Sequence, residues 1–349
     1  MRDHHALEVA VTPHVVFKID DPSRVGEARR FAAGLASSAG FDAVAAGRLA
    51  LVVTELGTNL LRHARGGRLL LAELPHDGAG IEVLSVDDGP GMSDFSRCLS
   101  DGFSSGGTPG TGLGAIQRLS SEFDAFSHPA HGTLIRAAVH GDAGMPASRS
   151  DKPAVGQTFV VGAVCTAAPG EIVSGDGWSR AEAENRIAIV VADGLGHGVD
   201  AAAASDEALR VFHLQSSAAP SDVLNSSHES LRRLRGAAVA IAQLDATART
   251  ITFCGAGNIA GRIISGLHDR SLLSQHGTIG LQIRRLQDIE YPWPEHALLV
   301  MHSDGINTRW DITAVPGLLQ CAPSLIAAWL WRSHCRGRDD ATAVVVRLQ

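Results

Sequence analysis

The sequence lacks the concentrated positive charge of a nucleic-acid-binding protein. Its 30 Lys and Arg residues are outnumbered by 37 Asp and Glu, and the formal net charge is −7. Proteins that bind nucleic acids concentrate positive charge against the phosphates, so we expect no nucleic-acid partner. The densest basic group is Arg232, Arg233 and Arg235, which we interpret as a solvated helix face.

Cysteine is also scarce, and its spacing excludes two kinds of stabilisation. The five cysteines are odd in number, lie far apart and form no C-x-x-C pair. This pattern argues against structural zinc and against a disulfide framework, and it favours reduced thiols in a cytosol. The positions are Cys98, Cys165, Cys254, Cys321 and Cys335.

Long uninterrupted apolar runs are missing as well. The N-terminal MRDHHALEVAV has no apolar signal-peptide core, and charge interrupts the longest apolar stretches within about ten residues. We therefore expect a cytoplasmic protein without a membrane span. Hydrophobic residues still make up 45% of the chain, enough for large cores, and the 349 residues suggest about two domains.

A polar segment rich in small residues, 141–154, divides the chain and is predicted to be a linker. We accordingly predict an α+β protein with domains at residues 1–140 and 155–349. In the first, the patterns predict strands over 14–20, 67–74 and 80–88, helices over about 23–38, 43–64 and 112–122, and two final strands. The second is richer in strands, with helices over about 198–215, 221–235 and 322–335.

Three motifs follow one another in the first half. On the helix over 43–64, Glu55 and Asn59 share a polar face because residues four apart stack on a helix. The strand over 80–88 then runs into Asp87-x-Gly89-x-Gly91, where glycine allows the backbone to approach a ligand closely. The third motif is Gly110-x-Gly112-x-Gly114, at the start of the next predicted helix.

The third motif by itself matches neither familiar phosphate-binding loop. Its spacing differs from the G-x-G-x-x-G of dinucleotide-binding turns, and it lacks the Gly-Lys-Ser/Thr of a Walker loop. In their order, however, the three motifs resemble the GHKL (Bergerat-fold) ATP-binding domains, over about residues 10–140. The resemblance implies an N-terminal α/β sandwich that binds ATP and Mg²⁺.

The same resemblance implies roles for individual residues. Glu55 would be the catalytic general base, Asn59 would hold Mg²⁺, and Asp87 would accept a hydrogen bond from the adenine amino group. The short interval between the motifs, and the sequence after them, are similar to small bacterial serine kinases of the anti-sigma and stressosome switch type. Gly89 and Gly91 would shape the base pocket, while Gly110, Gly112 and Gly114 would let backbone amides meet the phosphates.

The second half places aspartates where predicted strands end, in SGDGW, VVADGLGHG, MHSDG and RDDATAVVV. Carboxylates at strand ends can converge from distant parts of a chain. Hard cations such as Mg²⁺ or Mn²⁺ prefer oxygen ligands, and two of them about 4 Å apart can bind a phosphate and ionise a water. These segments predict a metal site.

The segments, DGLGHGVDA above all, resemble the PPM-type metal-dependent serine/threonine phosphatases of the SpoIIE-like branch, over about residues 155–349. The resemblance implies a β-sandwich flanked by helices and two Mn²⁺ or Mg²⁺ ions, with a metal-bound hydroxide attacking the phosphoserine. Asp193 would bridge the metals, the Gly194 carbonyl would bind one of them, and Asp176, Asp304 and Asp339 would complete the site.

Four positions leave alternatives open. Many relatives have an aspartate three residues after the position of Asp176, where this chain has Ser179, so one metal ligand is in doubt. Asp339 is taken as the ligand in preference to Asp340. His197 is either a packing residue or a proton donor to the leaving serine, and Asn258 is either a turn residue between two strands, the interpretation we favour, or part of the backbone near the pocket.

Together the two resemblances imply a bifunctional partner-switching regulator. It would phosphorylate and dephosphorylate serine or threonine on a STAS-domain anti-sigma antagonist or stressosome protein, using ATP in one half and metal ions in the other. In the alternative, the first half is an anti-sigma module that binds a sigma factor in an ATP-dependent way. A third hypothesis keeps only the phosphatase, with the ATP domain as a nucleotide sensor. A downstream phosphatase is a further candidate partner.

Overall fold

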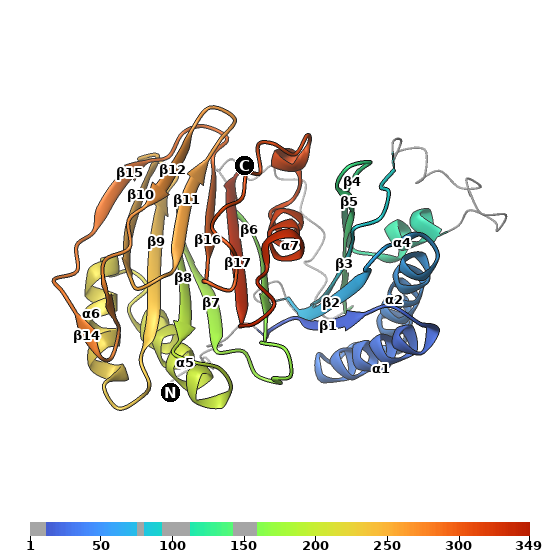
Figure 1. The fold of residues 1–349 in the computed structure, drawn as a ribbon, viewed down its shortest axis with the longest axis horizontal. Coiled ribbons are helices and arrows are strands. Elements are labelled where there is room, and N and C mark those ends of the chain that lie inside the picture. The colour runs from blue at the N-terminus through green and yellow to red at the C-terminus, as the bar shows by residue number, and fades with distance from the viewer. Residues whose placement is uncertain (1–11, 75–79, 93–111, 142–158) are drawn as a thin grey trace. The chain divides into compact units, whose positions relative to one another are not determined.

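The computed structural model describes residues 12–74, 80–92, 112–141 and 159–349 (Figure 1). These residues form two compact units. The N-terminal unit comprises the described residues of His14–Pro153 together with Asp311–Arg332, and the C-terminal unit comprises the described residues of Met1–Pro13 and Ala154–Trp310 together with Ser333–Gln349. The segment Asp311–Arg332 therefore belongs, by its packing, with a part of the chain that lies far before it in sequence.

The N-terminal unit is a five-stranded antiparallel sheet covered by helices. The strands are ordered β1-β2-β3-β5-β4. Helices α1, α2 and α4 share one hydrophobic core with the inward-facing strand residues, which gives the expected α/β sandwich. The elements are β1 (Val15–Lys18), α1 (Pro22–Ser38), α2 (Ala43–His63), β2 (Arg68–Glu73), β3 (Gly80–Asp87), α4 (Gly112–Leu119), β4 (Glu122–His128) and β5 (Gly132–His140).

Helix α2 shows how the sequence produces this packing. It begins after Asp42, whose side chain accepts a hydrogen bond from the Ala45 amide at 2.7 Å and so caps the helix. Its apolar stripe, including Leu49 and Leu56, is fully buried in the core. By length and composition α2 could cross a membrane, but the burial of its stripe makes it the core helix of this unit.

The segment Asp311–Arg332 includes most of α7 (Pro323–His334). Several of its polar contacts are with the sheet of the N-terminal unit. The amide of Ala322 donates to the Asp124 carboxylate of β4 at 2.8 Å, and Arg68 of β2 lies over the Trp331 ring at 5.6 Å from its centre. Residues 325–331 of α7 are all buried.

The C-terminal unit is a sandwich of two five-stranded sheets with helices on an outer face (Figure 1). The sheets are ordered β15-β10-β9-β8-β7 and β12-β11-β16-β17-β6, and their facing side chains form one core. Helices α5 (Val199–Leu214) and α6 (Pro220–Leu231) pack on the outer face of the first sheet. The predicted β-sandwich flanked by helices, and with it the α+β class, is confirmed.

The strands of this unit are β6 (Phe159–Thr166), β7 (Asp176–Ala183), β8 (Arg186–Gly194), β9 (Ala237–Asp245), β10 (Thr250–Ala256), β11 (Ala260–Ile264), β12 (Asp269–Leu272), β13 (Gly277–Thr278), β14 (Gln282–Ile283), β15 (Ile289–Pro292), β16 (Leu298–His302) and β17 (Ala341–Leu348).

One helix is shorter than the pattern predicts. Helix α6 ends at Leu231 rather than near residue 235, so the arginine group follows the helix instead of lying on its face. Its members make surface ion pairs: Arg232 with Glu229 at 3.0 Å and Arg235 with Asp200 at 2.8 Å. The interpretation of these arginines as a helix face was wrong, although they are solvent-exposed as expected.

Candidate functional site

Glu55 and Asn59 lie one turn apart on α2, and both are partly buried. Helix α4 begins directly beside them: a Cβ atom added at Gly112 would lie 3.6 Å from both Asn59 Oδ1 and Glu55 Oε2. The N-terminus of a helix carries unpaired amide groups and partial positive charge, which favour an anion. The structure therefore brings two of the three predicted motifs together. Gly114 is buried inside α4, and Gly110 lies outside the described residues.

The third motif follows β3. The buried carboxylate of Asp87 accepts a hydrogen bond from the Gly89 amide at 2.6 Å, and burial raises the pKa of this carboxyl. A Cβ at Gly89 would lie 3.2 Å from the His63 carbonyl oxygen at the end of α2. The turn therefore packs against the last turn of the helix that carries Asn59.

Gly91 is required by both conformation and space. Its φ is +64°, a region that residues with a side chain rarely adopt, and a Cβ would lie 2.2 Å from the His128 carbonyl oxygen. Glycine here lets the chain after Asp87 cross the end of β4. The predicted nucleotide-binding roles of these residues remain predictions, but the described motifs do converge around α2.

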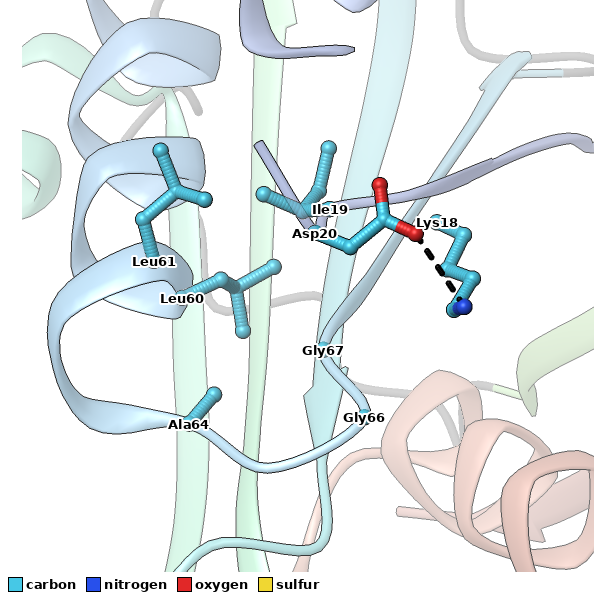
Figure 2. A pocket seen from close by; sticks show the side chains of 8 residues that line it. All are labelled: Lys18, Ile19, Asp20, Leu60, Leu61, Ala64, Gly66 and Gly67. Carbon is cyan, nitrogen blue, oxygen red and sulfur yellow. Dashed lines mark ion pairs between the residues drawn. The ribbon is translucent and has the colours of Figure 1, made fainter. Parts of the chain in front are cut away.

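Figure 2 shows a separate pocket of about 440 Å³ beside the C-terminal half of α2. Lys18 and Asp20 form an ion pair at its edge, with 3.1 Å between Nζ and Oδ2. None of the residues predicted to bind ATP lines this pocket, so it is not the predicted site. It is lined by Lys18, Ile19, Asp20, Leu60, Leu61, Ala64, Gly66 and Gly67.

In the C-terminal unit the sheet register places two predicted metal ligands opposite each other. Asp176 begins β7 and is paired across the sheet with Asp193 near the end of β8. Asp176 is buried, and its Oδ2 accepts a hydrogen bond from Ser303 Oγ at 2.6 Å. Ser303 Oγ in turn accepts from the Thr342 amide at 3.0 Å, so the residue after β16 and strand β17 of the other sheet orient this carboxylate.

Asp304 and Asp339 come from the loops that follow β16 and precede β17. Asp304 Oδ2 accepts a hydrogen bond from Asn258 Nδ2 at 2.8 Å. Asp339 is exposed, whereas Asp340 is buried and binds the amide of Ala168 through Oδ1 at 2.8 Å. Asp340 thus ties the loop after β6 to the start of β17, while Asp339 Oδ1 accepts a hydrogen bond from the Asp340 amide at 3.0 Å.

Neighbouring aspartates influence the pKa values of Asp176 and Asp193. Burial and the neighbouring charge of Asp176, together with Asp304 and the two aspartates before β17, raise the pKa of Asp193 to about 8. Burial, with Asp340 and Asp339 nearby, raises the pKa of Asp176 to about 7. The pKa of Asp176 and the pKa of Asp193 are therefore both raised, because burial and the neighbouring aspartates disfavour the charged form, and at Asp176 they outweigh the hydrogen bonds that its carboxylate accepts.

The chemistry of this cluster fits hard divalent cations. Its donors are carboxylate oxygens, which Mg²⁺ and Mn²⁺ prefer, and a buried oxygen, Asp340 Oδ2, has no hydrogen-bond partner. Within the described part of the chain, no three His, Cys, Asp or Glu side chains are close enough to hold an ion without moving. The metal-ligand assignments therefore remain predictions.

Gly194, at the end of β8, allows α5 to begin against the strand. A Cβ there would lie 2.0 Å from the Ala201 carbonyl oxygen, and the Gly194 amide donates to the Gly175 carbonyl at 3.0 Å. This close approach holds the loop containing Asp193 against the start of β7. The role of the Gly194 carbonyl as a metal ligand remains a prediction.

The side-chain alternation of β7 shows which face of the strand Ser179 occupies, at the position where many relatives have an aspartate. Trp178 lies in the core between the sheets, so Ser179 points to the opposite face. There its Oγ lies 2.8 Å from His213 Nε2 of α5. A carboxylate at this position would face the helix rather than Asp176.

Three residues near the aspartates acquire roles that their sequence context did not reveal. Asn258, interpreted as a turn residue, also orients Asp304. Ser303 orients Asp176; its place in MHSDG was the available signal. Glu171 lies 2.6 Å from the exposed His197, between Oε1 and Nδ1, so His197 has a carboxylate partner outside the predicted ligand set.

The two units define two classes of protein domain. An antiparallel sheet backed by helices, with Glu and Asn beside a glycine-opened helix, is the arrangement of a kinase-like ATPase domain. A two-sheet sandwich with aspartates at its strand ends is that of a metal-dependent phosphatase. Comparison with known families agrees: residues 20–139 match the histidine kinase-like ATPase domain, and residues 183–349 match stage II sporulation protein E (SpoIIE).

The chain belongs to the family of RsbT through its N-terminal histidine kinase-like ATPase domain, and its second half carries a SpoIIE phosphatase domain. It is 32% identical over 111 residues to the serine/threonine-protein kinase RsbT of Bacillus subtilis (strain 168), a match that covers 32% of this chain and 84% of that kinase. The protein is therefore an enzyme, a metal-dependent phosphatase joined to a kinase-like domain.

Solved structures extend the comparison. One, from work on the bacterial stressosome as a modular system adapted to control secondary messenger signaling, has a TM-score of 0.52 and 26% identity. It covers 54% of this chain and 100% of its own. A second, RsbX in complex with magnesium, has a TM-score of 0.50 and 20% identity over 55% of this chain and 96% of its own, which supports the fold.

Proposed function

We propose that this protein is a bifunctional partner-switching regulator that sets the phosphorylation of a STAS-domain protein. The N-terminal unit would transfer phosphate from ATP to a serine or threonine, and the C-terminal unit would remove it. The observation that carries this proposal is the presence, on one chain, of an RsbT-like ATPase domain and a SpoIIE phosphatase domain. Both domains retain the residues that their chemistry would use.

In the kinase half, positioning and charge would do most of the work, as phosphoryl transfer requires. Asn59 would hold Mg²⁺ at the phosphates, and Glu55 would take the proton from the attacking hydroxyl. Gly112 leaves the N-terminus of α4 open beside both side chains, which supports a phosphate position there. Asp87, at the far end of the site, would accept a hydrogen bond from the adenine amino group.

In the phosphatase half, the aspartates would hold two Mn²⁺ or Mg²⁺ ions, with the Gly194 carbonyl as a further ligand. When bound, the ions would neutralise the phosphate and activate water. The chain's own contribution is to aim the ligands: Ser303 orients Asp176 and Asn258 orients Asp304. The proposed ligands are Asp176, Asp193, Asp304 and Asp339.

The proposed partner follows from the kind of relatives. RsbT is a serine/threonine-protein kinase, and one structural relative comes from the stressosome. We place the protein in the cytoplasm, where its cysteines would stay reduced. A cytoplasmic STAS-domain protein would then be its substrate.

The test is a phosphate-transfer assay with the purified full-length protein, ATP, Mg²⁺ or Mn²⁺ and a candidate STAS protein. We expect serine or threonine phosphate to appear on the STAS protein with ATP, and pre-phosphorylated STAS protein to lose it with Mn²⁺ alone. Absence of both reactions with every STAS candidate contradicts the proposal. Binding of a sigma factor instead, measured by co-purification, supports the anti-sigma alternative.

A further inference from the structure

The turn that carries Asp87 is supported by a part of the chain that lies more than two hundred residues later. The segment Asp311–Arg332 falls in sequence between Asp304 and Asp339, yet it belongs to the N-terminal unit. Its last residue, Arg332, has a side chain only 4% exposed. A buried arginine is costly unless its donors are used, so its partners indicate what it does.

Arg332 binds the backbone at the end of β3. Its Nη1 donates to the Asp87 carbonyl oxygen at 2.6 Å and to the His131 carbonyl oxygen at 2.7 Å. Its Nε lies 3.4 Å from the Asp88 carboxylate. One guanidinium thus links the turn after β3 to the turn between β4 and β5.

The space beside this contact admits no side chain at position 132. Gly132 has φ +67°, and a Cβ there would lie 2.2 Å from the Asp87 carbonyl oxygen and 3.1 Å from Arg332 Nη1. Glycine at 132 therefore lets the two turns approach closely enough to share one guanidinium. The planar fork of arginine suits this geometry, whereas a lysine ammonium is a single point.

We propose that Arg332 is a positioning residue of the nucleotide site. By holding the Asp87 carbonyl and pairing with Asp88, it sets the backbone from which the Asp87 carboxylate reaches the adenine base. The proposal rests on the proposed function of this unit as an ATP-binding domain. It makes base recognition depend on a segment that lies between two predicted metal ligands of the phosphatase sequence.

This role predicts a selective defect. In the proposed site, interactions with the phosphates would come from α2 and α4, whereas the two hydrogen bonds of Arg332 Nη1 go to the turn after β3 and the turn between β4 and β5. Loss of the guanidinium should therefore disturb recognition of the base more than recognition of the phosphates. A residue that merely stabilised the fold would weaken all nucleotides alike.

The experiment measures binding of fluorescent ATP and GTP analogues to the full-length protein, with Arg332→Gln and Arg332→Lys as variants. Arg68→Gln is the matched control, because the Arg68 guanidinium lies over the Trp331 ring of the same segment, whereas the Arg332 guanidinium binds the Asp87 turn. We expect Arg332→Gln to weaken ATP binding about tenfold, the loss expected for charged hydrogen bonds, and to leave GTP binding within about twofold. Arg332→Lys should restore part of the preference for ATP.

Each outcome separates the inference from the function on which it rests. If the unaltered protein binds no ATP, the proposed ATP-binding function fails and the role of Arg332 fails with it. If it prefers ATP and Arg332→Gln keeps that preference, only the inference is overturned. An equal loss of ATP and GTP binding, or the same loss in Arg68→Gln, also overturns it, because either result indicates a general structural role.

Discussion

The two units treat buried carboxylates in opposite ways. In the N-terminal unit, burial by itself would raise the pKa of Glu82, but Arg136 and His14 outweigh burial and lower the pKa to about 2. In the C-terminal unit, burial and neighbouring aspartates raise the pKa of Asp193 to about 8. A carboxylate with a cationic partner stabilises its fold, whereas a group of carboxylates without one marks a place where a cation could bind.

The largest expected effect comes from removing a charge from the aspartate cluster. Asp193→Asn should lower Mn²⁺-dependent hydrolysis of p-nitrophenyl phosphate by about 100-fold or more, because the predicted bridging ligand is lost. Phosphate transfer from ATP should persist. Asp200→Asn is the control, since Asp200 is exposed and pairs with Arg235 at the surface. Loss of transfer in Asp193→Asn would show that the two sites are not separate.

Glu55→Ala tests the predicted general base of the N-terminal unit. A missing general base slows proton transfer by about 100- to 10,000-fold, so we expect phosphorylation of the STAS protein to fall by that order. Binding of an ATP analogue should remain, because Asn59 and Asp87 are unchanged. Equal losses of binding and transfer would instead assign Glu55 to nucleotide binding.

Glu82→Gln breaks the paired carboxylate. Because the pKa of Glu82 is lowered from 4.5 to about 2, its charge contributes about 3 kcal/mol to stability, which is present above pH 4.5 and lost as the pH falls toward 2. The variant should therefore unfold more easily near neutral pH and show a weaker pH dependence over that window in urea titrations. Glu122→Gln, which removes a half-exposed partner of the same Arg136, should cost less than about 1 kcal/mol. Similar costs for both variants would contradict a special role for the buried pair.

Gly91→Ala should have a local effect on nucleotide binding in addition to its cost in stability. A left-handed residue with a side chain costs about 1–2 kcal/mol, and here the added Cβ also meets the His128 carbonyl. Gly40→Ala carries the same conformational cost at φ +69° with nothing within 4 Å, so it isolates the steric term. ATP-analogue binding should weaken in Gly91→Ala alone. Unchanged binding there would exclude the Asp87 turn from the site.

Much of the fold was predictable because it rests on local patterns. Local patterns predict the apolar stripe of α2, the strand leading to Asp87 and the aspartates at strand ends. Such patterns can be recognised in the sequence without knowing how the elements pack. The end of α6 was not predictable by the same means, because its arginines fit a helix face as well as the turn they occupy. The role of Ser179 was undecided until the strand showed which face it occupies.

The order and type of the chemical groups were determined by the sequence alone. Glu55, Asn59 and Asp87 with their glycines, and the aspartates of the second half, predicted two chemistries because each chemistry requires those donors. Tertiary structure decided which groups meet. It paired Asp176 with Asp193 through strand register, gave Asp176 a donor in Ser303, and brought Arg332 to the Asp87 turn. Such contacts join residues far apart in the chain, and no local pattern encodes them because they depend on how sheets and helices pack.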